Sequence, residues 1–348
     1  MWTRCGLGEL FKPSSRAGSR RVAISSNKRS SSVGSGSNSY EHSKFMTEAT
    51  NDAYKHPKCY ANTRGGCSTK ISGEHYVSLG LIKLYGSNDP DYTIQHKTGK
   101  GVGHPVTPKN FKANILCREH NSALSPADDA ALAFATFLRR NALQYDAGAG
   151  EWGEAEEITI SGDDFQRWVL KIFLNHAVTG HFEEQQNRTV TFPTEAIDLL
   201  LNHAPWPPKW GIAVPGGQRS RDFRTVPFQP VDVVNSHWWG VRPVVHKDGT
   251  WMGGALVDLA HMSFGLTLFD DAGWRAPGLF DDNPANPIGG SLQQPAHIGW
   301  EMNGVEKRIN FTWDNPLHHY GLTYQLRPQD KADRLAGKPP VGEHFWLE

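Results

Sequence analysis

The chain has 348 residues, of which 36 are Lys or Arg and 36 are Asp or Glu, so its formal net charge is zero. A chain of this length has room for two or three domains and can bury about three quarters of its extended surface. Its apolar runs fall short of the roughly 18 residues that a membrane-spanning helix needs. Four cysteines are also too few for a disulfide scaffold.

Residues 1–45 form a basic arm whose composition predicts disorder. Up to Tyr40 the arm has seven Lys or Arg and one Glu, a net charge of +6, so the remaining chain carries −6. A segment rich in Ser, Gly and Arg cannot bury enough apolar surface to offset its chain entropy. Three interpretations stay open: a tail that contacts phosphates, a transit peptide, or a translation start at Met46.

Residues 46–150 are predicted to form the first folded domain, with a long helix near its end. Ser125 is a suitable N-cap, Pro126 suits the first helical position, and Asp128 suits the positive end of the helix dipole. Apolar residues then recur with helical spacing as far as Tyr145.

Residues 151–326 are predicted to form a second domain, so that the whole chain is of the α+β class. The segment 157–161 alternates like a strand, Asp163 or Asp164 is expected to cap a helix that runs to about residue 177, and 194–203 is a second short helix. Short segments rich in Val, Ile, Phe and Trp predict a mainly antiparallel sheet covered by two helices: 210–214, 227–234, 241–247, 251–258, 262–269, 296–301 and 306–313. The segment 327–348 is expected to be a loose tail.

Three of the four cysteines lie in the first domain and suggest a metal site. Cys59 and Cys67 are separated by seven residues, and Cys117 is followed three positions later by His120. Three thiols and one imidazole are an ordinary tetrahedral set for structural Zn²⁺, although the first spacing is wider than usual. The alternative is three reduced cysteines that are buried as small apolar side chains. The polar, Gly-bearing surroundings favour zinc.

A second group of residues predicts hydrolytic chemistry. Glu74 and His75 lie at the end of an expected strand, and Asn121 lies where a helix begins after a second strand. In that arrangement Glu74 and Asn121 face one another and can hold Mg²⁺ or Mn²⁺ through oxygen atoms, while His75 takes a proton from water. Taken singly, they are an ordinary surface carboxylate, a half-buried strand histidine and a turn residue.

The segments CSTKISGEHYVSLGL and ILCREHNSALSPADDAA together resemble the HNH (ββα-metal) endonucleases, in particular a bacterial and phage branch with S-x-E-H and L-C-x-x-H-N motifs. The resemblance covers about residues 57–140. It implies a zinc-stabilised ββα-metal domain, His75 as general base, and a cation at Glu74 and Asn121. It also places the second zinc pair at Cys117 and His120.

The sequence departs from the family pattern at the central asparagine. Asn114 lies nearer to the Leu-Cys pair than is usual and Asn110 lies farther away. These departures concern activity more than fold.

The leading hypothesis is therefore a metal-dependent endonuclease that hydrolyses phosphodiester bonds in nucleic acid, with DNA expected before RNA. The alternative is a zinc-stabilised module that binds nucleic acid or protein without catalysis. We expect a cytoplasmic protein with no membrane partner, and the oligomeric state is left open. Basic side chains expected to contact phosphates are Lys97, Lys100, Lys109, Lys112, Arg139 and Arg140.

Overall fold

The computed structural model describes residues 54–86, 91–96, 104–147, 152–182, 193–208, 210–215, 238–245, 252–260, 262–268, 291–326 and 341–347. The predicted basic arm, the predicted strand 227–234 and the lysines at 97 and 100 lie outside these described residues. All the described residues belong to one compact unit. None of the described helices is long and apolar enough to cross a membrane.

A short antiparallel strand pair leads into the first helices. Strand β1 (Ile71–His75) pairs with β4 (Lys112–Cys117), and α2 (Arg118–Ala123) begins at the next residue. The local order is therefore strand, strand, helix, as the sequence predicts. Between the two strands lie α1 (Leu79–Gly86), the ribbon of β2 (Ile94–His96) and β3 (His104–Val106), and the 3-10 turn η1 (Pro108–Asn110).

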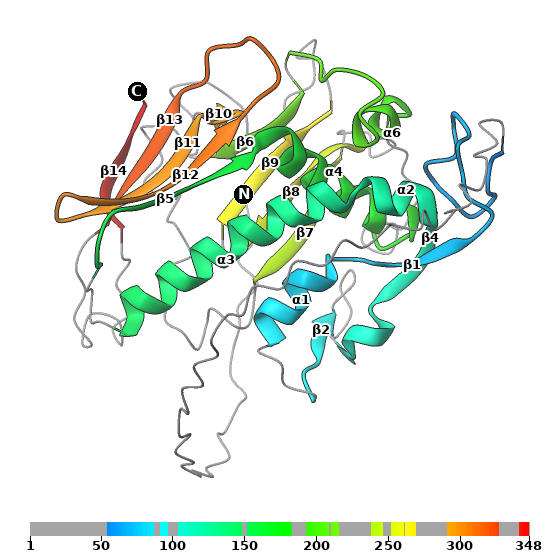
Figure 1. The fold of residues 1–348 in the computed structure, drawn as a ribbon, viewed down its shortest axis with the longest axis horizontal. Helices are drawn as coiled ribbons and strands as arrows, with labels where there is room; N and C mark the ends of the chain where they lie inside the picture. Colours follow the sequence, from blue (N-terminus) through cyan, green and yellow to red (C-terminus); the bar gives the residue numbers. More distant parts are fainter. Residues whose placement is uncertain are drawn as a thin grey trace, which may run out of the picture. The chain divides into compact units, whose positions relative to one another are not determined.

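Two long helices, α3 (Ser125–Ala147) and α4 (Gly162–Val178), pack against one another (Figure 1). Both were predicted, but both begin differently from the prediction. The carbonyl of Leu124 accepts the N–H of Asp128 at 3.2 Å, so Ser125 lies inside the first turn of α3. Ser161 is the N-cap of α4, because its Oγ accepts the N–H of Asp164 at 3.1 Å. The carboxylates at 163 and 164 instead lie in the first turn, where the helix dipole favours them.

One five-stranded sheet is antiparallel throughout its described pairs. Its strands run in the order β10 (Ser291–Gln293), β6 (Gly211–Pro215), β9 (Met262–Thr267), β8 (Met252–Leu259) and β7 (Trp239–Val245). This sheet confirms the expected antiparallel architecture. The second short helix is also present as α6 (Glu195–Leu200).

A second five-stranded sheet is mixed, which the sequence did not predict. Its order is β14 (Val341–Leu347), β13 (Gly321–Leu326), β11 (His297–Met302), β12 (Val305–Thr312) and β5 (Glu156–Ser161). The pairs β11–β13 and β12–β5 are parallel. A two-residue hydrophobic period shows that a segment is a strand but does not identify its neighbour. Strand β14 also corrects the expectation of a loose tail after residue 326, because it pairs with β13.

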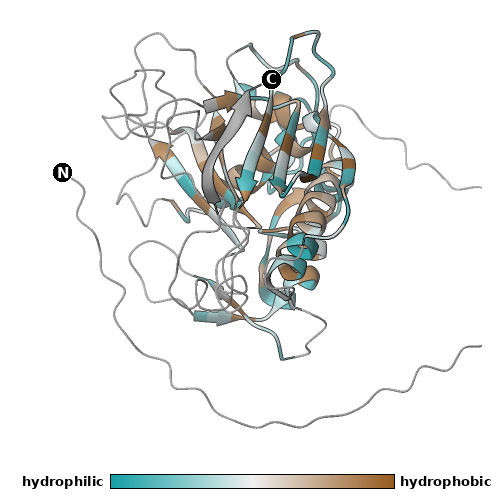
Figure 2. Ribbon diagram, turned by 90° about the vertical axis from the view of Figure 1, so that its left-hand side faces the viewer, coloured by the Kyte–Doolittle hydropathy of each residue, from teal (hydrophilic) through white to brown (hydrophobic). Residues whose placement is uncertain are grey.

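Aromatic side chains join the helices to both large sheets. Phe134 of α3 and Phe165 of α4 have ring centroids 4.8 Å apart, and Phe165 lies 5.0 Å from Phe264 of β9 and 5.8 Å from Phe311 of β12. The segments before and after residue 150 therefore share one apolar core. Apolar and polar residues alternate along these strands and helices, as elements with one buried face require (Figure 2).

Candidate functional site

The predicted ligands Cys59, Cys67, Cys117 and His120 form one buried cluster. Their ligand atoms all lie within 4.8 Å of one another. His120 Nδ1 lies 3.3 Å from the Sγ of Cys59 and 3.7 Å from the Sγ of Cys67. A tetrahedral zinc ion bonded to sulfur at about 2.3 Å and to nitrogen at about 2.0 Å would hold such atoms about 3.5 Å apart. The cluster therefore fits a single structural metal ion of the zinc type.

Local backbone geometry explains how the ligands reach one point. Gly65 and Gly66 have φ values of +88° and +70°, a conformation that favours glycine, and they turn the chain back before Cys67. The N–H of Cys67 then bonds to the carbonyl of Tyr54 at 3.1 Å. The wide spacing between Cys59 and Cys67 is thus taken up by a glycine turn.

The second ligand pair is positioned by the start of α2. Cys117 ends β4 and is the N-cap of the helix, since its Sγ accepts the N–H of His120 at 3.4 Å. His120 lies one turn further on, so both side chains point to the same place. A capping acceptor stabilises the first turn of a helix, and here that acceptor is also the sulfur of a predicted metal ligand.

The thiols of Cys59 and Cys117 differ in acidity. Burial raises the pKa of Cys59 to about 12, in spite of hydrogen bonds from the backbone of Cys117 and Ala61. Burial also acts on Cys117, but backbone hydrogen bonds from His120 and Ser68 outweigh it and lower the pKa of the Cys117 thiol. These N–H groups hold the thiolate form, which is the form that binds a metal.

Glu74, on β1, belongs to a largely buried network of charges. Its Oε1 is 2.8 Å from the Nζ of Lys171 on α4, and Lys171 is also 2.9 Å from Asp128 Oδ2 on α3. Glu74 is 5% exposed and Lys171 is 2% exposed. The ion triad of Glu74, Lys171 and Asp128 therefore joins β1 to the two long helices.

Polar side chains around the triad complete its hydrogen bonds. Ser78 donates its hydroxyl to Asp128 Oδ1 at 2.5 Å and accepts the indole N–H of Trp168 at 2.9 Å. Burial raises the pKa of Glu74 in spite of the Lys171 charge. Burial opposes the charge on Lys171, but the two carboxylates outweigh it and raise the pKa of the amine. One ammonium thus neutralises only one of two carboxylates, and the more buried one retains a proton more readily.

His75 ends β1 and is only partly buried. Lys112 is its partner across the strand pair. Burial, followed by the positive charge of Lys112, lowers the pKa of His75, so the imidazole is neutral near pH 7. Its backbone carbonyl accepts the side-chain N–H of Asn175 at 3.3 Å, and Asn175 Oδ1 in turn accepts the hydroxyl proton of Tyr60 at 3.1 Å. The chain next to Cys59 and the end of β1 are thereby both attached to α4.

The other predicted residues are placed as follows. Asn121 is half-buried on α2, immediately after His120. Lys109 and Lys112 are exposed on η1 and β4. Arg139 covers the ring of Tyr85 at 4.8 Å, and Arg140 forms an ion pair with Glu156. These two arginines lie about 20 Å along α3 from its first residue. They are therefore far from the start of α3, which follows Cys117 and His120 in the chain.

A second group of possible metal ligands was missed by sequence reasoning. The ligand atoms of His96, His176 and His181 lie within 4.8 Å of one another. Burial lowers the pKa of His176 to about 3, so this imidazole is neutral. The only available sequence signal was the pair His176 and His181 around Gly180 at a helix end, which is too common a pattern to identify a site.

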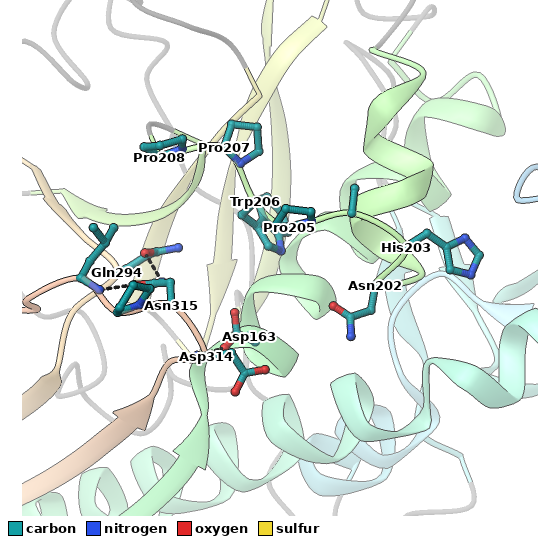
Figure 3. Close-up of a pocket in the computed structure, with 13 residues that line it drawn as sticks. Asp163, Asn202, His203, Pro205, Trp206, Pro207, Pro208, Gln294, Asp314 and Asn315 are labelled. Atoms are coloured by element: carbon teal, nitrogen blue, oxygen red, sulfur yellow. Dashed lines mark hydrogen bonds between the residues drawn. The ribbon is translucent and has the colours of Figure 1, made fainter.

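A pocket of about 590 Å³ lies in another part of the fold (Figure 3). Its wall carries the carboxylates of Asp163 and Asp314 on one side and Trp206 with neighbouring prolines on the other. Asp163 accepts the backbone N–H of Asp314 at 2.8 Å, and burial raises its pKa. None of the residues that the sequence analysis selected as candidate ligands, catalytic groups or phosphate contacts lines this pocket.

Comparison with known proteins gives no further identification, because no family model, curated protein or solved structure matches the chain.

Proposed function

We propose that the chain is a metal-dependent endonuclease whose general base is His75. The observation that carries this proposal is the position of His75 at the end of a strand pair that leads directly into the helix of the Cys₃His cluster. The partner of His75 across the pair is the exposed Lys112. A neutral imidazole beside an exposed ammonium suits the cleavage of a phosphodiester bond.

The two side chains have separate tasks in this mechanism. Lys112 binds a nonbridging phosphate oxygen and thereby places the phosphorus beside His75. His75 accepts a proton from the attacking water while the water oxygen bonds to phosphorus. The bond between phosphorus and the leaving oxygen then breaks, and the leaving oxygen takes a proton from solvent. Because burial and, after it, the Lys112 charge keep His75 unprotonated near pH 7, the base is ready before substrate binds.

The Cys₃His cluster holds structural zinc in this proposal and takes no part in the reaction. Its role is to fix the start of α2 against β4, so that His75 and Lys112 keep their relative positions. The attachment of the His75 carbonyl to Asn175 supports the same end of β1 from the other side. Asn175 and Lys171 are therefore positioning residues.

The sequence also predicts Mg²⁺ or Mn²⁺ as a second metal, with Glu74 and Asn121 as its ligands. Oxygen ligands suit both ions. The ammonium of Lys171 already lies 2.8 Å from Glu74 Oε1, so the arrangement does not fit a cation at that atom. The steps assigned to His75 and Lys112 accordingly do not depend on Glu74 as a ligand.

The same ion pair favours the second candidate function, a zinc-stabilised module that binds nucleic acid without cleaving it. A Glu74 that only bridges β1 to α4 and α3 needs no cation. This alternative requires zinc, salt-sensitive binding and no response to Mg²⁺.

Two cleavage assays distinguish the endonuclease from the binding module. They are the nicking of supercoiled plasmid and the cleavage of labelled DNA and RNA oligonucleotides, both with Mg²⁺ or Mn²⁺. We expect His75→Ala to lower the cleavage rate by about 10²–10⁴, the usual effect of a general base. The exposed histidine at 318 gives the matched control, His318→Ala, with unchanged rate and zinc content. Equal rates for wild type and His75→Ala, or no cleavage by either on both substrates, would reject the enzyme in favour of the binding module.

A binding measurement tests the role of Lys112 separately. Lys112→Ala is expected to weaken binding to all sequences alike and to reduce the salt slope by about 1, as loss of one phosphate contact requires. Arg139→Ala serves as the comparison because its guanidinium covers Tyr85 at the far end of α3. Equal effects of both changes would show that Lys112 makes no specific phosphate contact.

A further inference from the structure

We infer that His96, His176 and His181 form a second metal site, which takes a zinc-type ion and leaves a coordination position open to water. The three residues come from β2, from α4 and from the turn after α4. Their ligand nitrogens lie within 4.8 Å of one another. This inference does not rest on the proposed nuclease function, because metal binding can be measured without any reaction.

The end of α4 brings two of the ligands together. The N–H of His181 bonds to the carbonyl of His176 at 3.2 Å, and the N–H of Gly180 bonds to the carbonyl of Ala177 at 3.1 Å. Gly180 has a φ of +76°. This pattern is a Schellman motif, in which the residue after the left-handed glycine folds back over the last turn. That position usually makes an apolar contact, and here it pairs two imidazoles.

His176 has the protonation state of a metal ligand. Its Nδ1 is 2.7 Å from the carbonyl of Ile172, to which it donates a proton, so the lone pair is on Nε2. Nε2 is buried, in a residue that is only 4% exposed, and it makes no hydrogen bond to any residue that the structure describes. A ligating histidine characteristically donates its other ring N–H to a carbonyl or carboxylate. A buried acceptor without a partner is otherwise destabilising.

Aromatic rings surround the three imidazoles. The ring of Tyr76 lies 4.8 Å from His181 and 5.9 Å from His96 between centroids, and Trp239 lies 5.5 Å from His176. His176 is buried, whereas His96 and His181 are half-buried. Tyr76 and Trp239 therefore hold the imidazole rings in place. Water can reach the ion on the side of His96 and His181.

The donor set selects the class of metal. Imidazoles suit zinc, copper, iron and nickel, whereas Mg²⁺ and Ca²⁺ require oxygen ligands. No carboxylate belongs to this group of described residues. Zinc sites with three histidines characteristically bind water as the fourth ligand. At about 2.0 Å from the ion, the nitrogens would lie about 3.3 Å apart. Nitrogens that lie within 4.8 Å of one another therefore close by at most about 1.5 Å on binding.

The test uses the full chain, loaded with Zn²⁺ and, separately, with Co²⁺. We expect two equivalents of Zn²⁺ for the wild type and one for His181→Ala, with the weaker site lost. The loss of affinity should exceed the 10–100-fold effect of removing an outer hydrogen-bond partner. The matched control is His104→Ala, an exposed histidine on β3 opposite His96. It should keep both equivalents.

Cobalt spectra show which site is lost, because only the Cys₃His cluster gives thiolate-to-metal charge transfer. His181→Ala should retain that absorption and lose the d–d bands of the second ion. His96→Ala, on the half-buried side, repeats the test if His181→Ala does not fold, as judged by circular dichroism. A single equivalent in the wild type, or two equivalents in both folded variants, would overturn the inference.

Discussion

The two metal-capable clusters of this molecule are built in opposite ways. The Cys₃His cluster has four ligands, is buried throughout and draws on a glycine turn and one strand-to-helix junction. The three-histidine cluster has one open side, and its ligands come from segments 80 residues apart in the chain that α4 brings together. Closed thiolate sites stabilise a fold, whereas open imidazole sites leave room for a further ligand. Donor type and closure together therefore decide whether a cluster suits a structural metal ion or one that binds a further ligand.

Loss of the Cys₃His metal should have the largest effect on stability. Cys117→Ser removes a metal ligand and changes the N-cap of α2, and strong chelators should act similarly. Structural zinc sites contribute on the order of 10 kcal/mol of apparent folding energy in small domains. We expect a fall in Tm of more than about 10 °C and loss of bound zinc, measured by calorimetry and elemental analysis. If Cys117→Ser keeps both Tm and zinc content, the cluster is only apolar packing.

Breaking the ion triad should have the second-largest effect on stability. Lys171→Met leaves the buried carboxylate of Glu74 and the half-buried carboxylate of Asp128 without their ammonium, which costs up to about 3–5 kcal/mol. Urea unfolding measures this loss, and the triple replacement Lys171→Met with Glu74→Gln and Asp128→Asn provides the control, because it removes the charges together. The triple variant should recover most of the stability. No recovery would mean that packing, and not charge, accounts for the loss.

The pH dependence of the free energy of unfolding that Glu74 causes should be smaller than the effect of Lys171→Met. Because burial raises the folded-state pKa of Glu74, its contribution to stability is present at acidic pH. It is lost as the pH rises through that raised value. Relative to Glu74→Gln, the wild type should therefore lose about 1.4 kcal/mol for each unit by which the pKa is raised. Unfolding curves between pH 4 and about pH 8 measure this difference. A difference that grows with pH would show that Lys171 dominates the acidity of Glu74.

A substitution at Gly180, the glycine that ends α4, should have the smallest effect and should act on the three-histidine cluster alone. Gly180→Ala places a Cβ at a φ of +76° and should cost about 1–2 kcal/mol. It should weaken Zn²⁺ binding at the three-histidine cluster and leave the Cys₃His spectrum of the cobalt form unchanged. Isothermal titration of Zn²⁺ into both proteins measures the first effect. The comparison would fail if both sites weakened equally.

Local signals account for the part of the site that the sequence predicted. Cys117 and His120 are three residues apart at a strand-to-helix junction, and the polar context of Cys59 and Cys67 completes the set. Helices α3 and α4 were predictable because their apolar periodicity is long. Their first residues were not, because a cap depends on which neighbouring backbone groups lack a partner.

The missed features all depend on long-range contacts. In the sequence Lys171 is indistinguishable from the other polar residues of an amphipathic helix, because its role depends on the packing of α4 beside β1. No local sequence pattern identifies His96 as a metal ligand. The parallel pairing of β5 with β12 joins residues about 150 positions apart. Neither propensity nor period contains that information, because both are properties of short windows.

The ion pair between Glu74 and Lys171 also bears on the order of folding events. The ligands of the Cys₃His cluster span 62 residues, whereas Glu74 and Lys171 are 97 residues apart and meet only after α3 has formed between them. Contacts of greater sequence separation cost more loop-closure entropy and form later on average. A nascent chain can therefore capture its metal while α4 is still undocked. Stopped-flow refolding should resolve a metal-dependent early phase from a late phase that Lys171→Met slows.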